Sequence, residues 1–261
     1  MFLGKLNFSL RLAPSSLCRN KSKSASSTRW LYRQKIDPHV LKSRTENYRS
    51  RAAYKLAEIL KKYPLINKKT KNIVDLGFAP GSWTQVVLQL CKSLGVNSNI
   101  VGVDAIDCPP PQGAHFIKGD ILSNSTHQKI SSHLAAKSHF FPNSDPAYYD
   151  RPVNLILSDM MAKTSGNKDI DHFASMELCD AALILACLLL SPRGCLVLKY
   201  FAGKEDHLLY EKLSRLFKKL HKAKPDASRS ELREMYFIAI DRKSSVDCSE
   251  VFLPLTSENN T

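Results

Sequence analysis

Long apolar runs, cysteine pairs and metal-ligand clusters are scarce in this chain of 261 residues. The most apolar stretch, residues 181–190, is far shorter than the ~20 residues that a membrane-spanning helix needs, so we predict no span. The seven cysteines are odd in number and form no Cys-x-x-Cys pair, which argues against a disulfide framework or a zinc knuckle. His127, His133 and His139 lie six residues apart without a cysteine or acid to complete a set, so we expect no metal site.

Positive charge is concentrated in the N-terminal part of the chain. The formal net charge is +14; residues 1–71 hold 18 Lys and Arg against three acids, and the remaining 190 residues are nearly neutral. Such asymmetry indicates a polyanionic partner, an import signal or both. Residues 1–36 contain eight basic residues, seven serines and no acid, as a mitochondrial transit peptide does. We predict a location in the mitochondrial matrix; a basic tail that binds RNA or directs nuclear entry is the alternative.

Residues 37–243 predict one α/β domain that begins with a basic helix. Short apolar runs alternate with longer helical stretches, which is typical of a doubly wound, mostly parallel sheet with helices on both faces. The expected strands are 72–76, 100–103, 115–117, 153–157, 195–198 and 235–240. The expected helices are 50–63, 82–94, part of 126–137, 172–190 and 205–220. Residues 244–261 lack a regular pattern and predict a flexible tail.

Glycines and polar residues follow the expected strands, and in open α/β sheets the ligand lies at this carboxyl end. Gly77 and Gly81 allow a tight strand-to-helix turn and a close approach of the backbone to a ligand. Asp104 ends the second strand, where nucleotide-binding sheets place a carboxylate that accepts hydrogen bonds from ribose. These features predict a nucleoside ligand; for Asp104, capping the next loop is the alternative.

Several segments together resemble the FtsJ/RrmJ family of S-adenosylmethionine-dependent RNA 2′-O-methyltransferases, most closely its mitochondrial large-subunit rRNA branch. The match runs from about residue 50 to residue 243, and its strongest segments are residues 50–56, 74–83, 157–160, 197–199, 224–229 and 233–236. The resemblance implies a Rossmann-like fold with a seven-stranded sheet and S-adenosylmethionine as cofactor. It further implies 2′-O-methylation of a uridine in mitochondrial large-subunit rRNA, free or in a pre-ribosomal particle, in support of ribosome assembly. We expect a monomer.

By that resemblance, the family's catalytic tetrad falls on Lys55, Asp159, Lys199 and Glu234. Glu231 is an alternative to Glu234, although Glu234 matches the family's Arg-Glu-x-Tyr pattern. The residues that correspond to contacts with the methyl donor are Gly81, Trp83, Asp104, Asp120 and Asp159.

This sequence departs from the family pattern at three places. Ser82 replaces the second glycine of the Pro-Gly-Gly-Trp motif and Phe78 replaces an alanine, so we expect a bulkier turn that remains open. After the fourth expected strand, where the family has Asp-Met-Ala-Pro, this sequence reads Asp159-Met160-Met161-Ala162. Residues 121–151 form an insertion relative to bacterial relatives, which we interpret as a surface excursion; a ribosome contact is the alternative.

The chemistry requires that a ribose hydroxyl lose its proton while it is aligned with the methyl group. We expect Lys199 to be the general base, because burial, the Lys55 cation and a bound sulfonium would favour its neutral form. We expect Asp159 and Glu234 to position groups rather than to carry protons. The RNA is expected on a basic surface made of Arg49, Arg51, Lys55, Lys61, Lys62, Lys68, Lys69 and Lys71. A solvated linker is the alternative for this surface. For the whole protein, the alternatives are a tRNA or mRNA-cap methyltransferase and a non-catalytic rRNA-binding assembly factor.

Overall fold

The computed structural model describes residues 37–138, 151–229 and 232–253. The chain divides after Asp37 into two units, and the second, Pro38–Thr261, contains the elements given below. The predicted transit peptide, residues 1–36, lies outside the described residues. The strands are β1 (Asn72–Leu76), β2 (Asn99–Asp104), β3 (Ala114–Lys118), β4 (Val153–Ser158), β5 (Leu190–Phe201), β6 (Phe217–Ala223) and β7 (Glu234–Arg242). The helices are α2 (Pro38–Thr45), α3 (Ala52–Lys62), α4 (Ser82–Leu94), α5 (Asn124–Ser138), α7 (Lys168–Leu189), α8 (Asp206–Leu216) and α9 (Cys248–Val251).

The seven strands form one sheet in the order β3-β2-β1-β4-β5-β7-β6. The first five run parallel, whereas β7 is antiparallel to both β5 and β6. The strand order reverses between β1 and β4, which is where a doubly wound sheet opens a crevice for its ligand. The predicted mostly parallel, seven-stranded sheet is confirmed.

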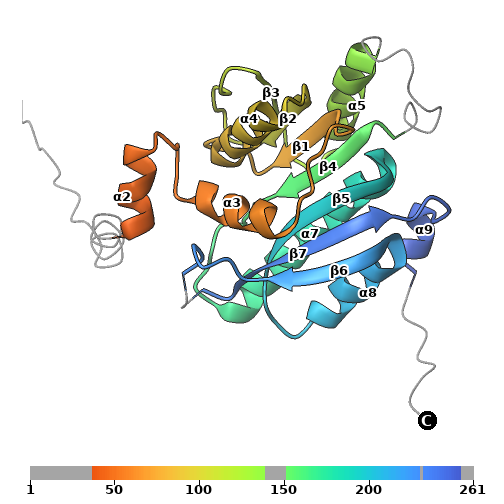
Figure 1. Cartoon of the computed structure of the whole chain (residues 1–261). Helices are drawn as coiled ribbons and strands as arrows, with labels where there is room; N and C mark the ends of the chain where they lie inside the picture. The colour runs from red at the N-terminus through yellow and green to blue at the C-terminus, as the bar shows by residue number, and fades with distance from the viewer. Residues whose placement is uncertain (1–36, 139–150, 230–231, 254–261) are drawn as a thin grey trace, which may run out of the picture. The chain divides into compact units, whose positions relative to one another are not determined.

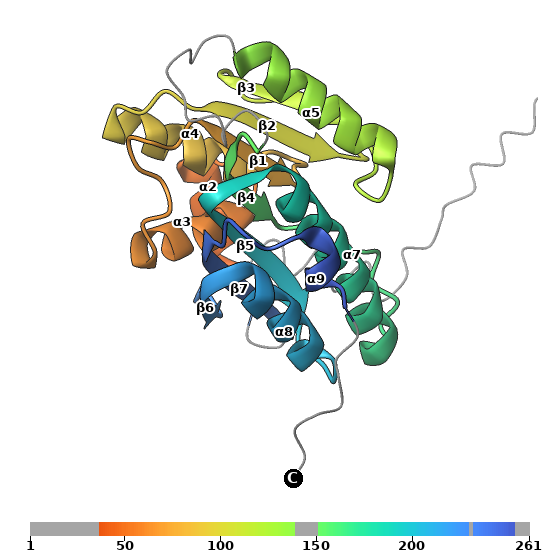
Figure 2. The same cartoon turned by 90° about the vertical axis from the view of Figure 1, so that its right-hand side faces the viewer.

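Helices cover both faces of the sheet (Figures 1 and 2). One core holds apolar residues of α5, α7 and α8, and the other holds those of α3 and α4. Every residue of β1 is buried, as expected for a parallel strand with helices on both sides. Among the described helices, α7 is long and apolar enough to match a membrane span, but residues such as Leu183 and Ala186 pack it against the sheet, as in a core helix.

Three expectations about chain segments need correction. The helix expected over 205–220 ends at Leu216, and the chain continues as strand β6 at the edge of the sheet. Part of the expected tail, residues 248–251, is the helix α9, whose Val251 is fully buried. Fifteen residues of the insertion form the helix α5, which places Ile130 in the core, and residues 139–150 of the insertion lie outside the described residues.

Candidate active site

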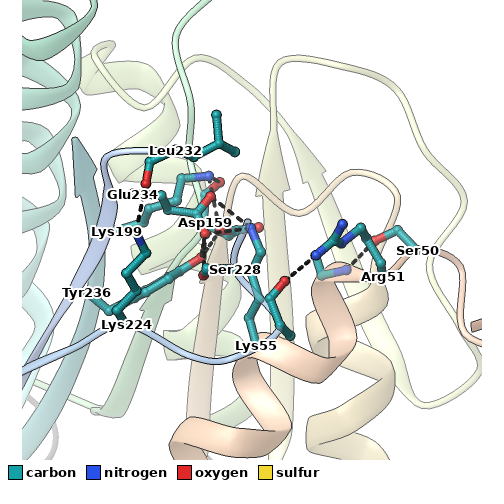
Figure 3. A network of polar contacts seen from close by, with 12 residues as sticks. Ser50, Arg51, Lys55, Asp159, Lys199, Lys224, Ser228, Leu232, Glu234 and Tyr236 are labelled. Atoms are coloured by element: carbon teal, nitrogen blue, oxygen red, sulfur yellow. Dashed lines mark hydrogen bonds and ion pairs between the residues drawn. The ribbon is translucent and has the colours of Figure 1, made fainter. Parts of the chain in front are cut away.

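The four residues of the expected tetrad meet beside the carboxyl ends of the parallel strands β4 and β5 (Figure 3). Lys199 of β5 places its Nζ 3.0 Å from Oδ1 of Asp159, which directly follows β4, and also donates to the Asp159 carbonyl oxygen at 2.5 Å. Lys55 of α3 places its Nζ 2.7 Å from Oε1 of Glu234, the first residue of β7. Side chains up to 179 positions apart in the sequence therefore form two adjacent ion pairs.

Glu234 is almost completely buried, and its charge is supported by several donors. Burial raises the pKa of Glu234, but the ammonium groups of Lys55 and Lys199 and a hydrogen bond from Ser228 outweigh it, so the pKa is lowered overall. A buried carboxylate is stable only when it is paired in this way. The alternative, Glu231, lies outside the described residues.

Tyr236 joins the two ion pairs. Its hydroxyl lies 2.9 Å from Oδ1 of Asp159 and 3.2 Å from Oε1 of Glu234, and its side chain is fully buried. Burial, then the charges of Asp159 and Glu234, raise the pKa of Tyr236 far above its ordinary value, so the hydroxyl keeps its proton. The sequence prediction missed Tyr236 and Ser228 as site residues, although both lie in segments that match the family pattern.

The turn between β1 and α4 requires glycine at two positions. A Cβ on Gly77 would lie 2.8 Å from the backbone of Met160, and Gly81 has a φ of +94° with the Phe78 ring 2.8 Å from where its Cβ would be. Phe78 itself is buried and points away from solvent over Gly102 of β2, whose added Cβ would lie 2.1 Å from the ring. The bulk of Phe78 therefore lies inside the fold, packed against Gly81 and Gly102.

Acids end β2 and β3 as predicted. Asp104 accepts hydrogen bonds from the backbone N–H groups of Ala79 and Ile106, both at 2.8 Å, so it caps the next loop and also joins it to the glycine turn. Each carboxylate oxygen still has a free lone pair for a ligand. Asp120 is exposed, and its Oδ1 accepts from the backbone of Leu122 at 3.0 Å.

Trp83 occupies a different place from the other candidate donor residues. Its side chain is buried between α3 and α4, where Nε1 donates to the carbonyl of Ala52 at 2.9 Å and the ring centroid lies 5.9 Å from that of Tyr236. Ser82, which replaces a glycine of the family pattern, pairs its hydroxyl with that of Ser50 at 2.7 Å. These contacts join the helix that carries Lys55 to the helix that follows the glycine turn.

Asp75 lies inside the sheet beneath the turn and is 1% exposed. Its Oδ2 accepts a hydrogen bond from Thr84 at 2.7 Å, while Oδ1 has no hydrogen-bond partner among the described residues. Burial raises the pKa of Asp75 to about 7, and the charges of Asp159 and Asp104 contribute to the rise despite the Thr84 hydrogen bond. A positive charge bound near this carboxylate would compensate for that cost.

Two arginines of the expected RNA surface have intramolecular roles. Arg49 donates from its guanidinium to the carbonyls of Pro80 and Pro109, at 2.8 and 2.5 Å, and so connects the loops after β1 and β2. Arg51 donates to the carbonyl of Ala227. In the described part of the chain, His, Cys, Asp and Glu side chains form no group of three that could hold a metal ion.

The strand order, the glycine turn after β1 and the acids that follow β2 and β3 are typical of a nucleoside-binding α/β enzyme, and two lysine–carboxylate pairs lie at the same end of the sheet. Comparison with known proteins narrows this class. The chain belongs to the FtsJ-like methyltransferase family, whose model matches residues 48–242, and the methyl donor of this family is S-adenosylmethionine.

Named relatives cover most of the chain. "rRNA methyltransferase 2, mitochondrial" of Saccharomyces cerevisiae is 35% identical to this chain, and the alignment covers 88% of this chain and 92% of the yeast protein. "Ribosomal RNA large subunit methyltransferase E" of Bartonella bacilliformis is 38% identical over 85% of this chain and 87% of its own. A crystal structure from Plasmodium falciparum, solved under the name of a ribosomal RNA methyltransferase, aligns with a TM-score of 0.62 at 29% identity and covers 75% of this chain and 98% of its own.

Proposed function

We propose that this protein transfers the methyl group of S-adenosylmethionine to the ribose 2′-oxygen of a uridine in mitochondrial large-subunit rRNA. The observation that carries the proposal is the hydrogen-bonded series formed by Lys55, Glu234, Tyr236, Asp159 and Lys199 at the ligand-binding edge of the sheet. The mitochondrial and large-subunit rRNA methyltransferases among its relatives support the substrate class.

The residues around the glycine turn fit a nucleoside donor. Gly81 would allow the close approach of the backbone, Asp104 would accept hydrogen bonds from ribose, and Asp120 would bind the adenine edge. Trp83 would contribute by fixing the helix after the turn, and Asp159 would contact the methionine end. When bound, the donor supplies an electrophilic methyl group on a positively charged sulfur.

Lys199 is the proposed general base. Oδ1 and the carbonyl oxygen of Asp159 both contact Nζ of Lys199. The third bonding position of this nitrogen is therefore left for the ribose hydroxyl. Lysine is normally protonated at neutral pH, so the amine must first lose a proton before it can accept one from the ribose hydroxyl. The single-turnover rate at saturating donor should therefore rise with pH.

Lys55 and Glu234 are proposed to position the target sugar. Lys55 is held by a buried carboxylate, so its ammonium keeps a fixed place beside the reacting groups. Ser228 and Tyr236 in turn donate hydrogen bonds to Oε1 of Glu234. Because the four charged groups interact, a pH profile reports on the cluster as a whole.

The proposed setting is the mitochondrial matrix, where a monomer would act on rRNA or a pre-ribosomal particle and support ribosome assembly. The basic leader-like residues 1–36 and the mitochondrial relative support this location. A role on tRNA or an mRNA cap, or a non-catalytic role in assembly, would give a different result in the experiment below.

The test is methylation of isolated mitochondrial large-subunit particles and of naked rRNA with labelled donor. We expect the parental protein to methylate one of them, and Lys199→Met to lower the single-turnover rate by about 100-fold or more, as for loss of a general base. Lys212→Met is the matched control, because Lys212 forms a similar ion pair with Asp180 away from the site. Near-parental activity in Lys199→Met would exclude Lys199 as the base, and rRNA binding without methylation would favour the assembly factor.

A further inference from the structure

We propose that the RNA strand continues from the catalytic centre along a basic face formed by the end of α3 and the edge strand β6. This β6 face consists of Lys62, Tyr63, Lys219 and His221. The inference rests on the proposed function and specifies where the polyribonucleotide backbone is bound. None of the residues of β6 belongs to the basic surface that the sequence predicted.

The strand register places Lys219 and His221 on the same side of the sheet as α3. His221 pairs with Ile238 and Lys219 with Ile240, two β7 residues that belong to the core beneath α3 and α4. The rings of Tyr63 and His221 lie 5.0 Å apart between centroids, and Lys62 Nζ lies 5.5 Å from the Tyr63 ring. The end of α3 and the middle of β6 therefore form one continuous surface.

The positive charge on the β6 face is uncompensated, unlike that on the opposite side of the strand. On the α8 side, Lys222 lies over the rings of Phe237 and Tyr210. Lys218 pairs with Asp241 at 3.1 Å. Within the described ranges, by contrast, exposed Lys219 has no acidic partner. The nearby acid Glu58 of α3 is engaged by the backbone N–H groups of residues 226 and 227.

The composition of this face suits a single nucleic-acid strand. Lys219, His221 and Lys62 are exposed, and Tyr63 and Ile240 are only partly covered, so cations and ring surfaces are available together. Lysines bind phosphates through charge, and aromatic rings provide stacking surfaces for bases. A protein partner of acidic character would need the charges but not the rings.

The β6 face leads to the catalytic centre. Strand β6 ends at Ala223, which pairs with Tyr236, and the segment after it carries Ser228, a hydrogen-bond partner of Glu234. Lys219 pairs with Ile240, six residues from Glu234 along β7, which corresponds to about 20 Å of strand. Several nucleotides next to the target could therefore contact this face.

The experiment is a salt titration of rRNA-fragment binding by the full-length protein. The variant Lys62→Gln/Lys219→Gln removes two charges from the face, and the control Lys92→Gln/Lys129→Gln removes two exposed lysines from α4 and α5. We expect the slope of log K against log salt to fall by about 1.4 in the test variant, because each phosphate of a single strand that a lysine neutralises contributes about 0.7. The control should keep the parental slope.

Methylation gives a second readout. The KM for rRNA should rise in the test variant while the affinity for S-adenosylmethionine stays parental. A Tyr63→Leu variant should weaken binding without changing the salt slope, because it removes a stacking surface and no charge. An unchanged slope in Lys62→Gln/Lys219→Gln, or an equal fall in the control, would overturn the proposal. Failure of the parental protein to methylate any rRNA would overturn the proposed function alone, since the binding slope does not depend on catalysis.

Discussion

The buried carboxyl of Asp75 should make the stability of the protein depend on pH. Its pKa of about 7 lies well above the 3.8 of an unfolded aspartate. Between these values the folded state binds the proton and the unfolded state does not, so the free energy of unfolding falls as the pH rises. At about 1.4 kcal/mol for each pH unit, ionisation of Asp75 alone should lower the free energy of unfolding by about 3 kcal/mol between pH 5 and pH 8.

The assay is urea unfolding at several pH values, followed by tryptophan fluorescence, for the parental protein and Asp75→Asn. The asparagine keeps an acceptor for Thr84 but cannot ionise, so its curve should lack the contribution of this group. The difference in the free energy of unfolding between the two proteins should grow as the pH rises from 5 to 7 and should level off above pH 7. Saturating S-adenosylmethionine should reduce it, because a bound cation favours the carboxylate. Parallel pH profiles for the two proteins would show that Asp75 does not cause the pH dependence of stability.

Three further predictions concern the site. Glu234→Gln leaves the Lys55 ammonium without its buried partner, so urea unfolding should show a loss of about 3 kcal/mol and single-turnover assays a large fall in rate. Gly81→Ala should weaken donor binding in calorimetry by about tenfold or more. Gly95 also has a positive φ but open space around its Cβ, so the control Gly95→Ala should leave donor binding unchanged. Equal effects of the two substitutions would show that only backbone strain matters. Gly102→Ala should destabilise the fold in urea, and adding Phe78→Ala should recover part of the loss; additive losses would contradict the proposed packing.

The parallel part of the fold could be predicted because local pattern and tertiary role agree there. The run 72–76 contains the apolar residues Ile73, Val74 and Leu76 between Lys71 and the turn glycine Gly77, and it is strand β1. The strand β6 could not be found in this way. Leu213, Phe217 and Leu220 keep a helical spacing, but pairing with β7 overrides it after Leu216.

The tetrad could be located only through the family resemblance. Nothing near Lys55 in the sequence indicates that its partner lies 179 positions away, because the topology of the sheet alone brings them together. The same applies to Tyr236, whose pattern as a strand residue predicts burial but not its bond to Asp159. The intramolecular bonds of Arg49 were equally hidden, since an arginine in a basic segment is typical of a solvent-exposed surface.

We propose that this protein methylates a ribose 2′-oxygen of rRNA with Lys199 as general base. The most direct measurement is nucleoside mass spectrometry of mitochondrial large-subunit rRNA after incubation with S-adenosylmethionine and either the parental protein or Lys199→Met. The parental protein should produce 2′-O-methyluridine and the variant should not. A methyl group on a base, or equal 2′-O-methylation by both proteins, would contradict the claim.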